Sequence, residues 1–305
     1  MNVLYGIEKA NNIPEQTSLA IGNFDGIHIG HQKILKCLMD TSKRLNLSSL
    51  VLTFHPHTGY MLKKKSLKLL QTLDQRLKEI SKYDISCVLI VPFTKKFSRI
   101  SSHNFIKNIV LETLHAKAVI IGEDFHFGKN REGNVSKLME LSKKYDFRAY
   151  PVAQEIISGK TVSSSLIRSY LFEGKIEEAN KMLGKYYEIT GQVIKGSLKG
   201  RTLGFPTANI QTENDIIPSG VFLTYVEIEK SFYPSLTNIG SCPTLKSPGT
   251  YIESHILHFH SSLYEKLIKV QFIKKIRDEI KFKNSEALVT QLKKDLKTAM
   301  NYFKV

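Results

Sequence analysis

The sequence of 305 residues has no tryptophan, only three cysteines and no long hydrophobic run. Cys37, Cys87 and Cys242 are far apart and form no CxxC pair, which argues against a disulfide framework and a structural zinc site. A membrane-spanning helix needs about 20 consecutive apolar residues, and the N-terminal segment lacks the basic-then-apolar order of a secretory signal. We therefore expect a cytoplasmic protein with reduced thiols and no membrane partner.

Acidic residues are scarce relative to basic ones. The chain has 44 Lys and Arg against 28 Asp and Glu, a formal net charge of +16. Such an excess suits a nucleic-acid-binding protein or an enzyme whose small substrates are polyanions. The lysines are scattered and no nucleic-acid recognition motif is present, which favours small-molecule substrates and no nucleic-acid partner. A basic regulator that binds RNA or DNA is the alternative from a different functional class.

The periodicity of apolar residues predicts two domains that meet near residue 185. In the first, short apolar runs alternate with segments of helical spacing, which predicts an α/β domain with a doubly wound parallel sheet covered on both faces. The expected strands are 18–24, 49–54, 87–93, 118–122 and 148–152, and the expected helices are 31–46, 72–83, 102–114 and 135–145. Two short helices joined at Gly174 then close the first domain.

From Tyr186 the pattern changes to β-branched and aromatic residues with frequent Gly and Pro breaks. This composition predicts an antiparallel barrel or sandwich. Residues 284–303 have helical spacing and begin with an Asn/Ser cap, so a C-terminal helix is expected. We place the domains at 1–185 and 186–305.

The run AIGNFDGIHIGHQKIL at 20–35 predicts a phosphate-binding corner. It combines a buried strand, a glycine-rich turn and a helix that opens at about Gly30, where backbone N–H groups and the helix dipole attract anions. His28 and His31 can each donate a hydrogen bond to phosphoryl oxygens during attack at an α-phosphate. A capping or surface role is the structural alternative. A zinc site is a poorer explanation, because no third ligand follows in an obvious pattern.

A second set of phosphate ligands is expected in SSSLIRSYL at 163–171, where hydroxyl groups and Arg168 suit the β- and γ-phosphates. A serine-rich helix cap explains the segment equally well. In the second domain, Thr207 and Asn209 offer hard oxygen ligands of the kind that Mg²⁺ prefers. Glu253, in an alternating strand, is a candidate general base for phosphoryl transfer. A turn for the first pair and an ordinary exposed strand position for Glu253 are the alternatives.

Seven segments resemble the bacterial bifunctional riboflavin kinase/FAD synthetase (FMN adenylyltransferase) family. They occur in the same order as in that family and extend along essentially the whole chain. They are GNFDGIHIGHQKIL (22–35), TFHPH (53–57), IGEDFHFGKNREGN (121–134), SSSLIR (163–168), GRTLGFPTAN (200–209), NIGSCPT (238–244) and ESHIL (253–257).

This resemblance implies an HxGH nucleotidyltransferase domain followed by a β-barrel riboflavin kinase-like domain with a C-terminal helix. The barrel would phosphorylate riboflavin with ATP to FMN, and the first domain would transfer AMP from ATP to FMN, giving FAD and pyrophosphate, both with Mg²⁺. The implied residues are His28 and His31 for adenylyl transfer; Gly22, Phe24, Gly30, Ser164 and Arg168 for ATP; Asp124, Phe125 and Phe127 for the flavin; Thr207 and Asn209 for the metal; and Glu253 as the kinase base.

Aromatic side chains at 125 and 127 suit contact with an isoalloxazine ring, although core packing explains each of them as well.

The chain departs from the family pattern at several positions, most of them in the second domain. Cys242 stands in place of an arginine, His258 in place of an aspartate and Glu265 in place of a glycine. Loss of an arginine near a nucleotide removes a fixed charge and a bidentate donor. In the first domain Thr58 replaces a proline and Ser165 a threonine. A monofunctional FMN adenylyltransferase with an inactive kinase-like module is therefore the alternative to the bifunctional interpretation.

Overall fold

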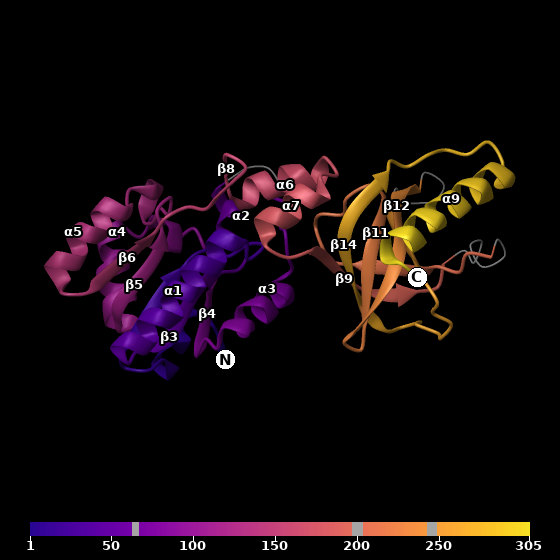
Figure 1. Ribbon diagram of the computed structural model, residues 1–305. Coiled ribbons are helices and arrows are strands. Elements are labelled where there is room, and N and C mark those ends of the chain that lie inside the picture. Colours follow the sequence, from indigo (N-terminus) through magenta and orange to yellow (C-terminus); the bar gives the residue numbers. More distant parts are fainter. Residues whose placement is uncertain (63–66, 197–203, 243–248) are drawn as a thin grey trace. The chain divides into compact units, whose positions relative to one another are not determined.

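The structure is a computed structural model that describes residues 1–62, 67–196, 204–242 and 249–305 (Figure 1). Its contacts divide the chain into two compact units, Met1–Ser164 and Ser165–Val305. The boundary expected between residues 185 and 186 stays a prediction. Within the described residues no helix combines the length and the apolar composition that crossing a membrane requires.

A six-stranded parallel sheet forms the centre of the first unit. Its strand order is β1-β4-β3-β2-β5-β6. The strands are β1 (Asn2–Tyr5), β2 (Thr17–Ile21), β3 (Ser48–Phe54), β4 (Cys87–Val91), β5 (Ala116–Gly122) and β6 (Arg148–Val152). The predicted doubly wound sheet is confirmed. The sequence did not reveal β1, because this four-residue edge strand buries none of its side chains fully and so carries no apolar run.

Successive residues of the sheet face two separate hydrophobic cores. Leu19 and Ile21 of β2 belong to one core and Ala20 to the other, as expected for side chains that alternate across a strand. Helices α1 (Ile29–Leu45) and α3 (Leu73–Ile80) cover the face of Ala20, whereas α5 (Val135–Tyr145) and a π-helical segment, Phe105–Thr113, cover the other. The expected helix at 102–114 thus begins as α4 (Ser102–Asn104) and continues with π-helical hydrogen bonds.

The order of the strands creates a switch point between β2 and β5. From β2 the chain passes to β3 and β4 on one side, and then returns to β5 and β6 on the other side. In sheets of this kind, ligands bind outside the carboxyl ends of the strands at the switch point. The loops after β2 and β5 are those that contain the histidine motif and the predicted flavin segment.

The second unit contains two short helices and a barrel. Helices α6 (Ser164–Phe172) and α7 (Ile176–Leu183) are joined through Gly174, whose φ of +71° favours glycine. Six antiparallel strands close the barrel in the order β10-β13-β12-β11-β14-β9, which settles the choice between barrel and sandwich. They are β9 (Tyr187–Ile194), β10 (Ala208–Thr212), β11 (Gly220–Ile228), β12 (Ser231–Cys242), β13 (Gly249–Ile256) and β14 (Leu267–Arg277).

The interior of the barrel is partly polar. The fully buried hydroxyl groups of Thr224, Thr237 and Ser254 are linked in a row by hydrogen bonds of 2.7 Å, and Ser235 joins this row through Thr224. Because each hydroxyl has a partner, their burial avoids the cost of an unsatisfied polar group. The rings of Phe222 and Phe272, with centroids 5.2 Å apart, fill the apolar part of the interior.

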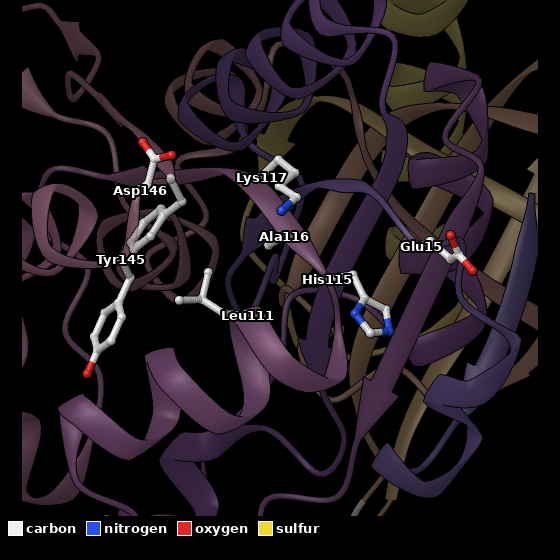
Figure 2. Close-up of a pocket in the computed structure, with 8 residues that line it drawn as sticks. Glu15, Leu111, His115, Ala116, Lys117, Tyr145 and Asp146 are labelled. Atoms are coloured by element: carbon white, nitrogen blue, oxygen red, sulfur yellow. The ribbon is translucent and has the colours of Figure 1, made fainter.

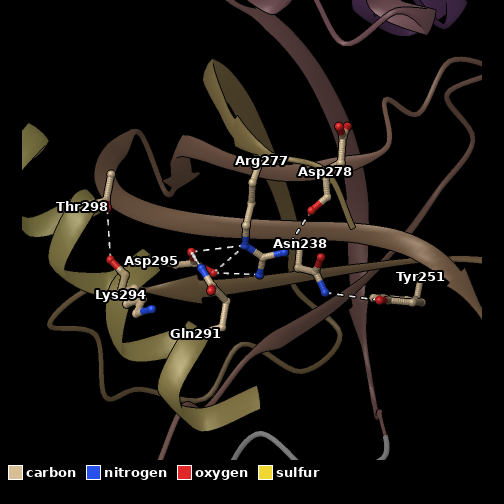
Figure 3. Close-up of polar contacts among 8 residues, drawn as sticks. All are labelled: Asn238, Tyr251, Arg277, Asp278, Gln291, Lys294, Asp295 and Thr298. Atoms are coloured by element: carbon tan, nitrogen blue, oxygen red, sulfur yellow. Dashed lines mark hydrogen bonds and ion pairs between the residues drawn. The ribbon is translucent and has the colours of Figure 1, made fainter. Parts of the chain in front are cut away.

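The C-terminal helix packs on the outside of the barrel. Helix α9 (Ser285–Phe303) begins with Asn284, whose side chain caps it, as the sequence predicts. It buries Ala299 against Val221 and Leu223 of β11. Figure 3 shows the ion pair that fixes the contact: Arg277 of β14 donates to both carboxylate oxygens of Asp295, the shortest distance being 2.7 Å from Nη2 to Oδ2. Asp295 is only 4% exposed.

We expect Asp295→Ala to destabilise the attachment of α9 to the barrel, because it leaves the largely buried Arg277 without its carboxylate. Breaking one partner of a buried pair costs on the order of 3 kcal/mol. Hydrogen–deuterium exchange of the amides in α9 and β14, followed in increasing urea, measures the loss. Glu229→Ala is the control, because it breaks an exposed pair with Lys266 and should leave exchange unchanged. Equal protection in the two variants would contradict the role of the Arg277–Asp295 pair.

Candidate active sites

The two histidines of the HxGH pattern stack on each other at the start of α1. His28 is the N-cap residue, and its Nδ1 accepts a hydrogen bond of 3.3 Å from the backbone N–H of His31. The imidazole rings lie 3.7 Å apart between centroids, with an angle of 17° between their planes. Since Nδ1 of His28 is an acceptor, a neutral His28 carries its proton on Nε2, which is then a donor. The structure thus brings the two predicted catalytic residues together, and His28 also caps the helix.

Two of the predicted ATP-site residues, Gly30 and Phe24, shape this stack. A Cβ atom on Gly30 would lie 3.3 Å from Cε1 and Nδ1 of His28, a spacing that would force the ring to move. Phe24 is fully buried, and its ring meets that of His31 edge-on at 5.3 Å. Gly22 in turn lies close to the Phe24 ring. The side chain of Phe24 therefore supports His31 from inside the protein.

The turn that leads to His28 has an unusual backbone. Phe24, Gly26 and Ile27 have φ values of +51°, +88° and +43°. Left-handed conformations suit glycine, but they are disfavoured for Phe and are genuine outliers for a β-branched residue such as Ile. Such residues persist only where their surroundings hold them. The carbonyl of Ile27 accepts a hydrogen bond of 2.9 Å from Nε2 of Gln32.

A buried arginine, which the sequence analysis did not single out, reaches the same turn from α3. Arg76 is 2% exposed, and its Nη1 donates to the carbonyl oxygen of Asn23 at 2.6 Å and to Oγ1 of Thr53 at 3.2 Å. Its position was detectable in principle: Arg76 lies at helical spacing among Leu73, Leu77 and Ile80, where a charged residue on an apolar face needs an explanation.

Ser164 and Arg168, the predicted triphosphate ligands, are in different surroundings. The hydroxyl of Ser164 donates to the carbonyl oxygen of Asp25 at 2.9 Å, which attaches the end of the first unit to the turn before His28. Arg168 belongs to the second unit, where its Nη1 lies 3.4 Å from Oγ of Ser165. Their contact with phosphate stays a prediction.

The segment after β5 divides into exposed and buried residues. Asp124 is exposed and Phe125 is half-buried, whereas Phe127 is 6% exposed and packs on Phe105 in the hydrophobic core. A Cβ atom on Gly122 would lie 3.0 Å from the Asp124 carboxylate and 3.6 Å from Ile34 of α1. This proximity places Asp124 beside α1, the helix that His28 caps. Core packing therefore accounts for Phe127, and Asp124 and Phe125 are the accessible members of the segment.

In the barrel, Asn209 and Glu253 lie directly across from each other on β10 and β13, and Asn238 of β12 lies on the other side of Glu253. Ser254 points into the barrel, where it bonds Thr237, so the neighbouring Glu253 faces outward. Burial raises the pKa of Glu253. The structure thus brings together the predicted base and one of the two predicted metal ligands.

The other predicted metal ligand, Thr207, lies in a half-buried segment before β10. The carbonyl oxygen of the preceding residue, Pro206, is 2.8 Å from Nδ1 of His255, two residues after Glu253 on the same face of β13. The first residues of the GRTLG motif, 200–203, lie outside the described residues.

Polar residues that the sequence analysis missed lie next to Glu253. The hydroxyl of Tyr251 donates to Glu279 at 3.0 Å and accepts from Nδ2 of Asn238 at 3.3 Å, the second contact being visible in Figure 3. Burial and the bond to Glu279 raise the pKa of Tyr251 to about 12. Tyr251 is therefore neutral at physiological pH.

Glu265, His258 and Cys242, at which the second domain departs from the family pattern, lie in different parts of the barrel unit. Glu265 has a φ of +66°, so the glycine expected there would remove a strain of about 1 kcal/mol. His258 is exposed in a turn with a φ of +55°. The side chain of Cys242 lies outside the described residues.

A recess of about 130 Å³ lies at the amino end of β5. Figure 2 shows residues that line it, among them Glu15, His115, Lys117 and Tyr145. The histidine motif follows the carboxyl end of β2, so the recess lies at the opposite edge of the sheet, and none of the predicted site residues lines it. Within the described residues, no group of three or more His, Cys, Asp or Glu side chains could hold a metal ion.

Comparisons with known proteins cover both units. A family model for FAD synthetase matches residues 10–166, and a family model for riboflavin kinase matches residues 183–303. A solved structure from Streptococcus pneumoniae, described as a macrolide-efflux protein, has a TM-score of 0.90 and 25% identity, with 99% of each chain covered. That description applies to the S. pneumoniae protein alone.

Curated relatives match over nearly the full length of both chains. Proteins named bifunctional riboflavin kinase/FMN adenylyltransferase are 37% identical in Buchnera aphidicola subsp. Schizaphis graminum, 34% in Haemophilus influenzae and 31% in Escherichia coli K12. Each comparison covers 99% of this chain and 98% or 99% of the relative. The two matched domains and these full-length relatives show that the chain belongs to the bifunctional riboflavin kinase/FMN adenylyltransferase family.

Proposed function

We infer that the chain catalyses two consecutive reactions of flavin cofactor synthesis. The C-terminal barrel phosphorylates riboflavin with ATP to FMN, and the N-terminal unit adenylylates FMN with a second ATP to FAD, releasing pyrophosphate. The observation that carries this conclusion is the presence of both family domains in one chain that matches bifunctional relatives from end to end. It favours the bifunctional enzyme over a monofunctional adenylyltransferase with an inactive barrel.

For adenylyl transfer, we propose that His28 and His31 hold the ATP phosphates. A phosphate oxygen of FMN attacks the α-phosphorus of ATP, the bond to the β-phosphate oxygen breaks, and pyrophosphate leaves. Negative charge builds on the α-phosphate oxygens and on the leaving group, where Nε2–H of His28, His31 and the N-terminus of α1 stabilise it. Gly22 and Gly30 permit close approach of the backbone, and Ser164 and Arg168 bind the outer phosphates.

The acceptor FMN is proposed to lie at the switch point between β2 and β5. Asp124 and Phe125 are accessible there, whereas Phe127 supports Phe125 from the core, with ring centroids 6.2 Å apart and nearly parallel planes. An aromatic face of this kind suits an isoalloxazine ring. This assignment places the flavin next to the helix that holds the ATP phosphates.

For the kinase, we propose that Glu253 accepts the proton of the terminal ribityl hydroxyl of riboflavin. The hydroxyl oxygen then attacks the γ-phosphorus of ATP, the bond from that phosphorus to the β-phosphate oxygen breaks, and ADP leaves. A raised pKa strengthens the carboxylate as a base. Thr207 and Asn209 would hold Mg²⁺, which neutralises phosphate charge when bound. Their hydroxyl and amide oxygens are ligands that Mg²⁺ accepts alongside phosphate and water, and the position of Asn209 across from Glu253 fits this role.

We further propose that the enzyme acts in the cytoplasm on small molecules, with neither nucleic acid nor membrane as a partner. The scattered lysines and the absence of a paired-cysteine motif in the sequence support this proposal.

Purified protein incubated with riboflavin, ATP and Mg²⁺ tests the bifunctional assignment when the flavins are separated by chromatography. We expect FMN to appear first and FAD to follow. FAD that forms only when FMN is supplied would contradict the kinase assignment.

Replacement of both His28 and His31 by alanine is expected to lower the rate of FAD formation from FMN by roughly 10³-fold or more, because two donors to the transition-state charge are lost. Phosphorylation of riboflavin by the same sample should be unchanged and serves as the internal control. Loss of both activities would show that the two reactions are not divided between the units as proposed.

Glu253→Gln is expected to lower the kinase rate by about 10²-fold or more and to stabilise the barrel at pH 7. Burial raises the pKa of Glu253 above its usual 4.5. Below pH 4.5 the folded and unfolded states both carry the proton, so burial costs nothing extra, whereas above the folded-state pKa the folded state bears the cost of a buried charge. The stabilisation should therefore be present at pH 7 and absent at pH 4.

Thermal unfolding at the two pH values measures this effect. Glu227→Gln provides a control of opposite sign, because the Glu227 carboxylate lies 2.7 Å from Nζ of Lys269 and its loss should destabilise the barrel at pH 7. A Glu253→Gln protein that is less stable at pH 7, or one that keeps full kinase activity, would be inconsistent with a buried catalytic base.

Asn209→Ala is expected to raise the free Mg²⁺ concentration for half-maximal kinase activity by roughly tenfold, since it removes one of two oxygen ligands that the protein supplies. FMN formation measured over a series of Mg²⁺ concentrations gives this value. The Mg²⁺ dependence of FAD formation from FMN, in the other unit, should stay as it was. An unchanged Mg²⁺ requirement of the kinase would rule out Asn209 as a ligand.

A further inference from the structure

Arg76 is a buried arginine whose hydrogen bonds connect the turn after β2 to the end of β3. Its guanidinium is buried between the turn that follows β2 and the last two residues of β3, which supply its acceptors, and Arg76 is not among the predicted site residues. Besides Asn23 and Thr53, its Nη1 lies 3.3 Å from the carbonyl oxygen of Phe54. A buried charge without partners is very costly, and these acceptors offset that cost.

Asp25 provides the balancing charge. It is 3% exposed, its carboxylate accepts the backbone N–H of Leu70 at 3.0 Å, and its negative charge opposes the lowering of the Arg76 pKa by burial. Asp25 lies one residue after Phe24 and one before Gly26, within the left-handed turn. The same turn therefore contains a buried anion and, at Asn23, the carbonyl that Arg76 binds most closely.

The hydrogen bonds of Arg76 reach the turn from Asn23 to Ile27, whose backbone has disfavoured φ values. Phe24 and Ile27 have left-handed φ values that are disfavoured for residues with a side chain. Arg76 fixes the carbonyl just before Phe24, and this turn leads directly into the N-cap His28. A relaxed turn would change the start of α1 and separate the two imidazole rings, whose spacing of 3.7 Å leaves little room for adjustment.

We propose that Arg76 and Asp25 are positioning residues for adenylyl transfer: they hold the turn from Asn23 to Ile27 in its left-handed conformation, so that His28 and His31 stack at the start of α1. The inference rests on the proposed role of the two histidines. It adds a pair of residues that touch no substrate and act on the rate through the geometry of the imidazole rings.

The test uses the full-length protein with Arg76→Met, Arg76→Lys, Asp25→Asn and the double variant Arg76→Met/Asp25→Asn. Met keeps much of the apolar volume of the side chain and removes the charge, and the double variant removes both buried charges together, which limits the loss of stability. Lys retains the charge but has no planar fork of donors. Arg44→Met is the matched control, since Arg44 is an exposed arginine near the other end of α1, where it donates to the hydroxyl of the half-buried Tyr150 at 3.1 Å.

Three measurements are made on each variant: kcat and KM for FAD formation from FMN, the rate of riboflavin phosphorylation, and the imidazole nitrogen resonances of His28 and His31 in ¹⁵N-histidine-labelled protein. For Arg76→Met we expect kcat for FAD formation to fall roughly 10- to 100-fold, the effect of a misplaced catalytic group. KM for FMN and the kinase rate should stay unchanged, and both imidazole resonances should shift. Arg76→Lys should recover part of the lost rate, and Arg44→Met should resemble the unmodified protein.

Two results would overturn the proposal: an unchanged kcat in Arg76→Met and in the double variant, or a reduced kcat with imidazole resonances that do not move. If Arg76→Met fails to fold, Asp25→Asn and Arg76→Lys provide the same comparison. The imidazole resonances also separate this inference from the function on which it rests. If the His28→Ala/His31→Ala protein still made FAD, the catalytic role would fail, whereas a shift of the resonances in Arg76→Met would still establish the positioning.

Discussion

The hydrogen bond from the backbone N–H of His31 to Nδ1 of His28 connects the fold of the first unit to its chemistry. It satisfies a donor at the start of α1 that would otherwise have no partner in the helix. It also fixes the tautomer of His28 and sets the two rings face to face. For this bond to form, the chain must leave β2 through a turn with two left-handed non-glycine residues, and Gly30 must leave space for the ring. The stacking of His28 on His31 thus depends on the turn after β2 and on the buried residues Arg76 and Asp25 that hold this turn.

The barrel brings its proposed site residues together in a different way. Glu253 lies on a regular strand, and cross-strand register alone brings it opposite Asn209 and Asn238. No strained turn is needed, because the alternation of a β-strand turns Ser254 inward and Glu253 outward. The cost here is electrostatic, since a half-buried carboxylate must ionise next to a neutral tyrosine instead of a cation. The first unit thus positions its proposed catalytic residues through a turn with disfavoured φ values, and the barrel positions its own through strand register and burial.

The periodicity of the sequence was sufficient for the fold class, because buried strands and amphipathic helices leave local patterns. The parallel sheet, the helix from 285 to 303 and the turn at Gly174 all followed from such patterns, and the resemblance added the roles of the histidines. The polar supports of the sites did not follow. Arg76 bonds a carbonyl 53 residues away, and Tyr251 bonds Glu279 across 28 residues. Periodicity carries no information on such pairs. It did show a charged residue on the apolar face of a helix, which was the available signal for Arg76.

Each proposed site carries a feature that lowers the stability of the fold: disfavoured φ values in the first unit and a half-buried carboxylate in the barrel. Hydrogen bonds and an ion pair near each site offset this loss. Around the histidine turn, Arg76, Ser164 and Gln32 all donate to backbone carbonyls of residues 23–27, so the disfavoured φ values are opposed by bonds that only this conformation can make. In the barrel, the paired hydroxyl groups inside and the Arg277–Asp295 pair outside hold the strands whose register places Glu253. Removing Glu253 should therefore relieve a cost, whereas removing Arg76 should expose one. Under the proposed roles, stability and activity change in opposite directions for Glu253 and together for Arg76, so the sign of the change distinguishes the proposed kinase base from the proposed positioning residue.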